Sequence, residues 1–302
     1  MIRSALISLS HSPRAKQFVL SNSLARRTAR RFVAGEELEH ALAAARESNA
    51  AGLKVSLDFL GENVASREDA VRAREMYLGI FDRIAQEKLD ANVSVKLTQL
   101  GLDFGADFCL EQMLPIVKHA EALGNFVRID MEGSAYTDRT IGIARELRRR
   151  SPAVGTVIQA YLYRSEQDIR ALVAEGCRIR LCKGAYLEPA EIAFQEKREV
   201  DANFVKLMEL LLPSGVYHAI ATHDPRMIAA TEEFAARQGI AKDQFEFQML
   251  YGIRPDLQRR LIRDGYRMRV YIPYGRDWFP YFMRRLAERP ANLVFFVRNL
   301  FR

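Results

Sequence analysis

The chain has 302 residues, of which 49% are hydrophobic and 27% charged, a composition typical of a globular protein with a sizeable core. Its three cysteines show no metal-ligand spacing and no apolar run reaches transmembrane length, which argues against a zinc module and a membrane-spanning chain. The net charge of +7 is concentrated in the first 35 residues, which hold seven Lys or Arg and no acidic residue. The neutral remainder argues against a nucleic-acid-binding protein.

The basic N-terminal segment is predicted to be helical over residues 14–49, because apolar residues recur among charged ones until Gly52 ends the pattern. Its Arg- and Ser-rich composition is also that of a transit peptide. The pattern runs smoothly on to Leu42, however, which favours a helix of the mature protein. We therefore expect residues 1–52 to form an N-terminal helical extension.

Eight strand-like segments follow, and each is succeeded by a helical segment. The predicted strands cover residues 54–60, 92–98, 126–132, 156–161, 178–183, 217–222, 245–250 and 267–272. The predicted helices cover residues 67–88, 106–123, 138–150, 165–175, 199–212, 225–238 and 256–264, and a last one begins at Pro280. Eight β-then-α units favour an α/β fold of the closed (β/α)8 TIM-barrel type over an open sheet, with residues 53–302 as one barrel domain.

The segment after the eighth strand carries an unusual helix face. Pro273 and Gly275 are expected to end the strand, and Tyr281, Arg284, Arg285 and Glu288 then follow at helical spacing. Adjacent guanidinium groups repel each other unless an anion lies between them, and they bind carboxylate or phosphate through paired hydrogen bonds. This face is therefore a candidate anion site, with a solvated Arg/Glu face as the alternative.

Further polar side chains stand at the predicted carboxyl ends of the strands, where TIM barrels place their active sites. These residues are Glu62, Lys96, Asp130, Glu132, Gln159, Arg180, Lys183, Thr222, His223, Gln248, Tyr251 and Tyr271. We expect them to converge on one mouth of the barrel, beside Tyr281, Arg284 and Arg285.

The residue types at this mouth leave two chemistries open. Glycine-rich phosphate loops are absent from the sequence, and of the five histidines His223 alone falls at a strand end, so no metal site is expected. In one reading, Lys96 or Lys183 is a neutral nucleophile for Schiff-base chemistry. In the other, Lys96 and the arginine pair clamp a carboxylate, while Arg180, Lys183 and the Gly184–Ala185 backbone hold a diphosphate or an electron-rich ring.

At these residues the sequence resembles the flavin-dependent proline dehydrogenases, in particular the short monofunctional bacterial type. The resemblance is carried by Phe59-Leu-Gly-Glu62, Ser94-Val-Lys-Leu-Thr98, Ile129-Asp-Met-Glu132, Val157-Ile-Gln-Ala-Tyr161, Arg178-Ile-Arg-Leu-Cys-Lys-Gly-Ala-Tyr186, Ala221-Thr-His223, Glu246-Phe-Gln-Met-Leu-Tyr-Gly252 and the stretch from Tyr271 onward. It implies a distorted (β/α)8 barrel with non-covalent FAD. It also implies oxidation of L-proline to 1-pyrroline-5-carboxylate by hydride transfer to flavin N5, with electrons passed to a membrane quinone.

The resemblance also implies a role for each matching residue. Lys96, Arg284 and Arg285 are expected to bind the proline carboxylate, Tyr281 and Tyr271 to line the same pocket, and Glu62 to pair with Arg284 as a gate when the site is empty. Asp130 is expected to orient its neighbours, and Arg180 to lie near the reactive flavin nitrogen. The expected FAD contacts are Met131, Gln159, Arg180, Lys183, Gly184, Ala185, Thr222 and His223.

The same resemblance implies partners and a location. The chain leaves no room for the second dehydrogenase of the bifunctional relatives, so we expect a separate 1-pyrroline-5-carboxylate dehydrogenase to take the product. We expect a cytoplasmic protein, with peripheral attachment of the basic N-terminal segment to the inner membrane surface as an alternative to a helix packed beside the barrel.

Overall fold

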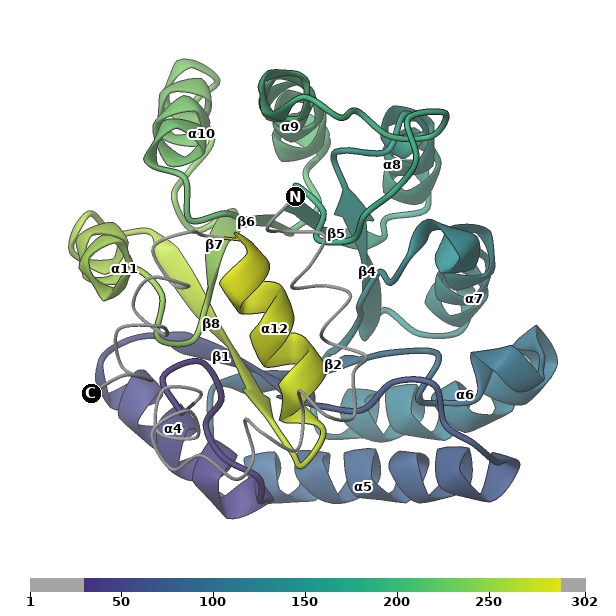
Figure 1. The fold of residues 1–302 in the computed structure, drawn as a ribbon. Coiled ribbons are helices and arrows are strands. Elements are labelled where there is room, and N and C mark those ends of the chain that lie inside the picture. The colour runs from purple at the N-terminus through teal and green to yellow at the C-terminus, as the bar shows by residue number, and fades with distance from the viewer. Residues whose placement is uncertain (1–29, 289–302) are drawn as a thin grey trace, which may run out of the picture.

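Eight parallel strands close into a barrel in the computed structural model, which describes residues 30–288 (Figure 1). Each strand pairs with its two neighbours in chain order, and the last strand closes on the first through pairs such as Leu57 with Ile272. The strands are β1 (Lys54–Phe59), β2 (Ala91–Val95), β3 (Val127–Ile129), β4 (Val154–Gln159), β5 (Arg178–Cys182), β6 (His218–Ala221), β7 (Phe245–Leu250) and β8 (Arg267–Tyr274). The predicted (β/α)8 barrel is confirmed.

Helices connect successive strands and form a ring outside the barrel (Figure 1). They are α5 (Arg67–Gln86), α6 (Ala106–Ala122), α7 (Thr137–Arg150), α8 (Ser165–Ala174), α9 (Lys197–Leu211), α10 (Pro225–Arg237) and α11 (Pro255–Arg263), with short 3-10 turns at Leu102–Phe104, Ser134–Tyr136 and Leu212–Ser214. The start of α5 is marked by a capping residue. The hydroxyl of Ser66 accepts a hydrogen bond from the Asp69 amide at 3.1 Å and caps α5.

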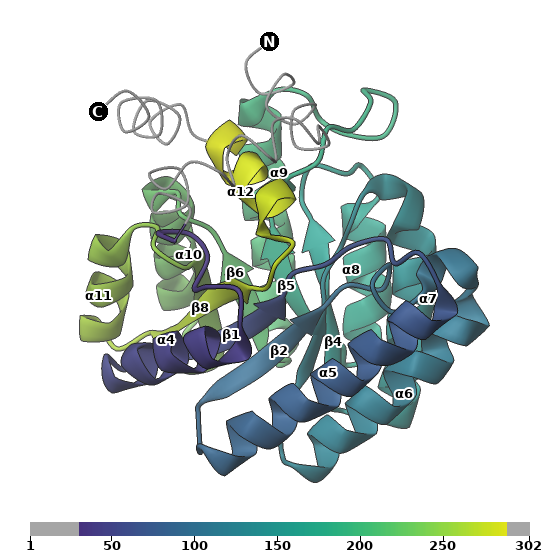
Figure 2. The ribbon, with the colours of Figure 1, turned by 60° about the horizontal axis from the view of Figure 1, so that its bottom comes forward.

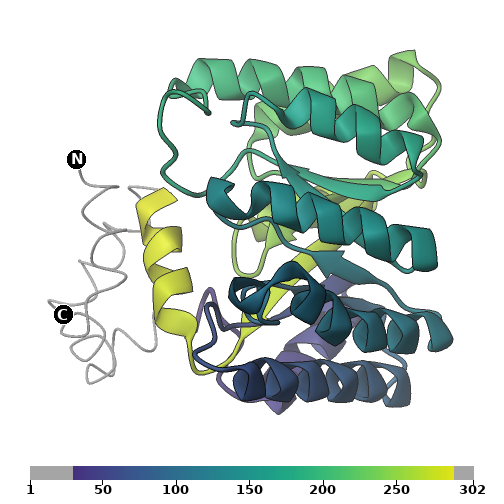
Figure 3. The ribbon, with the colours of Figure 1, turned by 90° about the vertical axis from the view of Figure 1, so that its right-hand side faces the viewer.

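The ring departs from a regular barrel at its first and last helices. Helix α4 (Leu38–Ala50) packs against β1 and β8 and fills the place where an eighth outer helix would lie (Figure 2). Helix α12 (Trp278–Glu288), which follows β8, leaves the ring and lies across the mouth at the carboxyl ends of the strands (Figure 3). This exchange of helices puts the predicted anion-binding face over the strand ends.

The barrel has an apolar outside and a polar inside. Outward side chains such as Leu57 and Val93 are fully buried under the helices. The inward positions usually hold branched apolar residues in this fold. Here they hold buried polar side chains, among them Ser56, Ser94 and Arg180. Because buried polar groups need hydrogen-bond partners, the interior of the barrel is a connected network of polar side chains rather than an apolar core.

The predicted helix over residues 14–49 is wrong in part. Residues 30–37 form turns and bends, and the helix begins at Leu38. The amide of Ala34 donates to the carbonyl of Pro273 and the amide of Gly275 donates to that of Gly35, both at 2.9 Å. These bonds attach Ala34 and Gly35 to the end of β8, which periodicity alone does not reveal. Residues 14–29 lie outside the described part of the chain.

The prediction that Pro273 ends the eighth strand is also wrong, because β8 continues to Tyr274. Alternate residues of β8 face β7 and β1: the carbonyl of Tyr271 accepts from Tyr251, and that of Tyr274 accepts from Leu60. Position 273 therefore faces β7, whose pairing has already ended at Leu250. Proline, which has no N–H, can therefore occupy position 273 without the loss of a hydrogen bond between strands.

One expectation concerns a side chain that the structure does not describe. The side chain of Glu288, placed on the anion-binding face by its spacing, lies outside the described residues, as do residues 1–29 and 289–302. Within residues 30–288, no helix combines the length and the hydropathy needed to cross a bilayer.

Candidate active site

A cavity of about 430 Å³ lies at the carboxyl ends of the strands, beneath α12. It brings together residues from eight loops and strand ends that the sequence analysis singled out separately. Its lining includes Lys96, Asp130, Met131, Gln159, Arg180, Lys183, Gly184, Ala185, Thr222, His223, Tyr271, Tyr281, Arg284 and Arg285. Of the described residues expected at this mouth, three are not part of the lining: Glu62, Glu132 and Tyr251. Glu62 contacts the lining through Arg284. The individual roles stay predictions.

The roof of the cavity carries the arginine pair of α12. Arg284 donates to both carboxylate oxygens of Glu62, at 2.7 and 3.4 Å, and so ties α12 to the loop after β1. The guanidinium also lies 5.9 Å from the ring centre of Tyr186. The neighbouring Arg285 is buried and its guanidinium lies 5.0 Å from the ring of Tyr281. Two guanidinium groups and two aromatic rings therefore close the cavity from above.

The wall of the cavity holds a buried ion pair that the sequence analysis missed. Lys96 donates to Asp58 over 2.7 Å, and the two residues are 5% and 0% exposed. Burial opposes the charge of Lys96, but Asp58 and Asp130 outweigh it and raise the lysine pKa above its usual range. Lys96 is therefore a fixed ammonium group, which argues against a Schiff-base nucleophile at this position.

A signal for Asp58 exists in the sequence. In the first strand, Ser56 and Asp58 alternate with apolar residues, and this period of two marks the inward face of a barrel strand. Asp58 is not at the predicted end of its strand, so a selection of strand-end residues leaves it out.

The floor of the cavity is a cluster of Asp130, Arg180 and Tyr271. Arg180 donates to Asp130 at 2.6 Å, and the Tyr271 hydroxyl donates to the other oxygen of the same carboxylate at 2.6 Å. Below them, Arg180 donates to Ser94 at 3.0 Å and to Gln248 at 2.5 Å. Burial and the charge of Asp130 raise the pKa of Tyr271, so its hydroxyl stays protonated as a donor. These bonds fix the guanidinium plane of Arg180.

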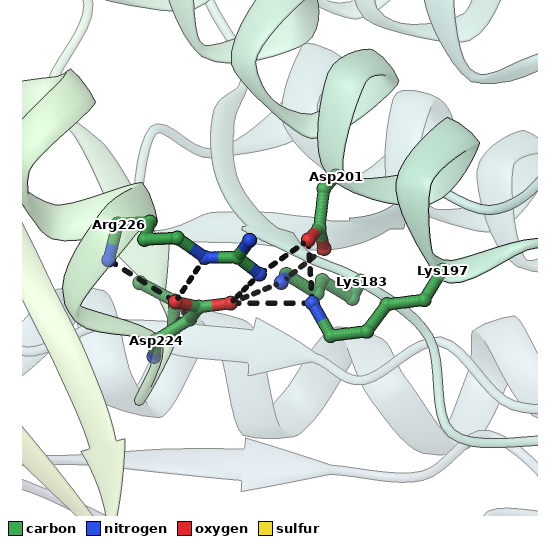
Figure 4. Close-up of polar contacts among 6 residues, drawn as sticks. Lys183, Lys197, Asp201, Asp224 and Arg226 are labelled. Atoms are coloured by element: carbon green, nitrogen blue, oxygen red, sulfur yellow. Dashed lines mark hydrogen bonds and ion pairs between the residues drawn. The ribbon is translucent and has the colours of Figure 1, made fainter.

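One edge of the cavity is strongly charged. Lys183 pairs with Asp201 and Asp224, and Lys197 and Arg226 contact the same two carboxylates (Figure 4). Burial opposes ionisation of Asp224, but Arg226 and Lys183 override it and lower its pKa. Three cations thus face two carboxylates, which leaves one positive charge in excess beside the cavity. The partners of Lys183 come from α9 and from the N-cap of α10. They are distant from Lys183 in the sequence, so no local pattern indicates them.

The comparisons with known proteins agree on one family. The family model described as proline dehydrogenase matches residues 41–298. Proline dehydrogenase 1 of Bacillus subtilis is 43% identical over 300 residues, 99% of each chain. The proline dehydrogenase of Deinococcus radiodurans is 39% identical over 305 residues, 99% of this chain and 98% of the relative. The chain belongs to the proline dehydrogenase family.

Structural similarity leads to the same family. A crystal structure of proline utilization A (PutA) from Bdellovibrio bacteriovorus, inactivated by N-propargylglycine, superposes with a TM-score of 0.83 at 28% identity. The match covers 87% of this chain and 33% of that one. The bifunctional protein PutA of Escherichia coli is likewise 28% identical, over 23% of its own length. The chain thus matches relatives named proline dehydrogenase over nearly their whole length, and it is an enzyme that oxidises proline.

Within this proline dehydrogenase fold, Gly184 shows why the cavity edge needs glycine. Its φ is +114°, and a Cβ placed there would lie 1.4 Å from Cδ1 of Tyr161. The chain can pass over that ring only where no side chain is present. After the neighbouring strand β6, Nε2 of His223 accepts from the Leu250 amide at 2.9 Å, so a neutral His223 carries its proton on Nδ1. Within residues 30–288, no three His, Cys, Asp or Glu side chains gather as a metal site.

Proposed function

We propose that this chain oxidises L-proline to 1-pyrroline-5-carboxylate with non-covalently bound FAD, as the first step of proline degradation to glutamate. The observation that carries the proposal is the convergence of Lys96, Arg284 and Arg285 on one cavity, beside the cluster of Asp130, Arg180 and Tyr271. When bound, FAD supplies the acceptor for the hydride of the substrate, at flavin N5.

Three cations are proposed to bind the proline carboxylate. Glu62 is itself a carboxylate on Arg284 at 2.7 Å, and it stands in for the anion that the arginine pair recognises. Substrate entry exchanges one carboxylate for the other, so the ion pair acts as a gate. Lys96 is held in place by Asp58, which makes Asp58 a positioning residue. A clamped carboxylate fixes the orientation of the small ring, and orientation is most of what hydride transfer requires of a protein.

The remaining lining suits an amine that must lose its proton before oxidation. Cations around the cavity lower the proton affinity of a bound ammonium group, as they do for a lysine beside like charge. Tyr281 and Tyr271 offer ring faces to the pyrrolidine and exclude water. Asp130 orients Arg180 and Tyr271 through the two bonds at 2.6 Å.

The other end of the cavity fits the cofactor. The excess positive charge around Lys183 suits a diphosphate, and the bare backbone at Gly184 and Ala185 permits close approach of a large group. Arg180 is proposed to favour negative charge on the bound ring system. The residues proposed to contact FAD are Met131, Gln159, Arg180, Lys183, Gly184, Ala185, Thr222 and His223.

Electron transfer to a membrane quinone and delivery of the product to a separate 1-pyrroline-5-carboxylate dehydrogenase complete the proposal. Relatives named as bifunctional contain the matching segment within a longer chain, which supports a handover between the two activities. We propose a cytoplasmic location, with peripheral contact at the inner membrane surface through the basic residues of the first 35 positions.

The absorption spectrum of the purified protein tests the reaction. We expect flavin bands that L-proline bleaches in the absence of oxygen. A variant with Arg180→Met should lose flavin or shift its potential, while Arg198→Met, an exposed arginine, serves as the control. A protein that stays colourless after added FAD, and that borohydride traps on a carbonyl substrate, would instead be a Schiff-base enzyme and would overturn the proposal.

A further inference from the structure

A second cavity, of about 700 Å³, lies at the opposite end of the barrel, where the strands begin. Its lining comes from the first residues of several strands and from the loops before them, including Asn92, Arg128, Arg178 and Arg269. A layer of buried inward side chains, which includes Arg180, lies between this cavity and the candidate active site. Residues at this end of a barrel ordinarily serve stability, so a ligand site here needs evidence of its own.

Arg128 is the first such evidence. It is 3% exposed, and its Nη1 donates to the carbonyls of Thr156 at 3.0 Å and Arg178 at 2.6 Å. Its Nε is buried and has no hydrogen-bond partner among the described residues. A buried donor of a charged group without a partner costs several times the gain of an ordinary hydrogen bond, so such atoms are rare unless a ligand or water completes them.

The space around Arg128 is kept open by the sequence. A Cβ on Gly155 would lie 2.8 Å from Nη1 of Arg128 and 2.2 Å from the carbonyl oxygen of Arg178. Glycine at 155 therefore admits the guanidinium to the cavity. Phe126 supports two guanidinium groups at once, because Cζ of Arg128 and Cζ of Arg178 lie 4.8 and 5.1 Å from its ring centre.

Asn92 is the second, independent piece of evidence. Its side chain is also buried, at 8% exposure, and its Oδ1 accepts no hydrogen bond within residues 30–288. Asn92 lies on β2, beside the strand that carries Arg128, and both residues line the cavity. The lining residues of the cavity thus include a buried unused donor on a cation and a buried unused acceptor.

The charges of the lining favour an anion as the partner. Besides Arg128, Arg178 and Arg269, the titratable lining residues are Lys88, Asp90, Glu121, Tyr217 and Glu246. Both oxygens of Glu246 are occupied by Arg269, at 2.7 and 3.1 Å, and Asp90 is paired with Lys54. Burial, together with the charge of Arg180, lowers the pKa of Arg128 to about 9, as expected for a cation short of compensation.

We propose that this cavity at the amino ends of the strands binds a small oxyanion that also carries a hydrogen-bond donor, held by Arg128 and Asn92. Hydrogen phosphate and hydroxy carboxylates both have this chemistry, since their oxygens accept from the guanidinium and their hydroxyl donates to the amide oxygen. The site is independent of the candidate active site and of its proposed reaction.

Calorimetry and thermal unfolding of the flavin-loaded enzyme test the proposal, with potassium phosphate, glycolate or acetate compared with potassium chloride at equal ionic strength. We expect phosphate or glycolate to bind and to raise the Tm, and acetate, which lacks the hydroxyl, to bind less well. The tighter of phosphate and glycolate identifies the source of the anion.

Three variants locate the binding. Asn92→Asp places a negative charge beside the anion and should weaken binding by about tenfold or more, and Arg128→Met should abolish it. Arg285→Met, in the other cavity, is the control and should leave phosphate binding intact. Should Arg128→Met fail to fold, Asn92→Asp decides alone. Absence of binding to the wild type, undiminished binding to Asn92→Asp, or loss of binding in Arg285→Met would overturn the proposal.

Discussion

The two ends of the barrel each hold an arginine–glutamate pair at 2.7 Å, but the pairs differ in what they join. At the carboxyl ends, Arg284 and Glu62 have 13% and 24% of their side chains exposed and connect a helix outside the ring to a loop. At the amino ends, Arg269 and Glu246 have 10% and 3% exposed and sit on the adjacent strands β8 and β7. One pair can separate without disturbing the barrel, whereas the other is built into its wall.

Burial and anchoring, rather than the distance between the charges, therefore decide whether an ion pair can be exchanged for a ligand. Glu246 also accepts from Gln248 at 2.5 Å and from Tyr217 at 3.0 Å, so its carboxylate has no capacity left for a ligand. Burial opposes its charge, yet Arg269 prevails and lowers its pKa to about 2. Glu62 contacts Arg284 alone among the hydrogen bonds above, and we propose that it leaves when a competing carboxylate arrives. The two mouths of one barrel thus combine a fixed end with an adaptable one.

The largest expected effect is on stability at the amino ends. Glu246→Gln leaves the charge of Arg269 buried without its partner, which costs roughly 3–5 kcal/mol of unfolding free energy. Denaturant unfolding measures this loss. The same substitution at the other mouth, Glu62→Gln, is the matched control, and the loss there should be smaller because Glu62 keeps 24% of its side chain in contact with water. Equal losses in the two variants would remove the distinction between the mouths.

The next largest effect concerns substrate binding at the carboxyl ends. Arg285→Met removes one charged donor from the proposed clamp and should raise the proline KM roughly 10- to 100-fold while flavin remains bound. Steady-state kinetics and the flavin spectrum of the same preparation report the two quantities separately. Arg276→Met is the control, because Arg276 lies in the loop before α12 with 78% of its side chain exposed. An unchanged KM in Arg285→Met would contradict the clamp.

How far these features could be predicted depends on the range of the interactions. The strand and helix order, and the convergence of residues such as Lys96 and Arg180 on one mouth, follow from local periodicity and from the geometry of parallel barrels. The family resemblance supplied the choice between a Schiff base and a carboxylate clamp. The Lys96–Asp58 pair joins strands 38 residues apart, and no local pattern specifies such a partner. The alternation in the first strand does mark residues that share a face, but only closure of the barrel brings the polar faces of different strands together.

Two buried groups, one at each end of the barrel, should change the free energy of unfolding with pH in opposite directions. Burial lowers the pKa of His218, at the start of β6, to about 3, and the neutral ring accepts from the Ile179 amide at 3.0 Å. The unfolded chain takes up a proton near the ordinary value of 6.5, so this residue makes stability fall as pH drops below 6.5. Burial raises the pKa of Glu132, in the loop after β3, to about 7. The folded state keeps that proton while the unfolded chain releases it above 4.5, so Glu132 makes stability fall as pH rises from 4.5 to 7.

Single variants separate these opposing contributions. Each amounts to about 1.4 kcal/mol per pH unit where the two windows overlap. Relative to the wild type, His218→Asn should become less stable as pH rises from about 5 to 6, and Glu132→Gln should become more stable by a similar amount. Urea unfolding across this interval measures both slopes. Parallel curves for the three proteins would contradict the assignment of these protons to the two ends.

The smallest effect tests whether the upper ion pair competes with substrate. In Glu62→Gln, Arg284 no longer has to give up a carboxylate before proline binds, so the energy of this partly buried pair, about 1 kcal/mol, is returned to binding. The proline KM should fall by at most about fivefold, and the fall should shrink at high salt because salt already weakens the pair. Glu37→Gln, which breaks the exposed contact of Glu37 with Arg276, is the matched control. A rise in KM would mean that Glu62 shapes the binding site instead of opposing entry to it.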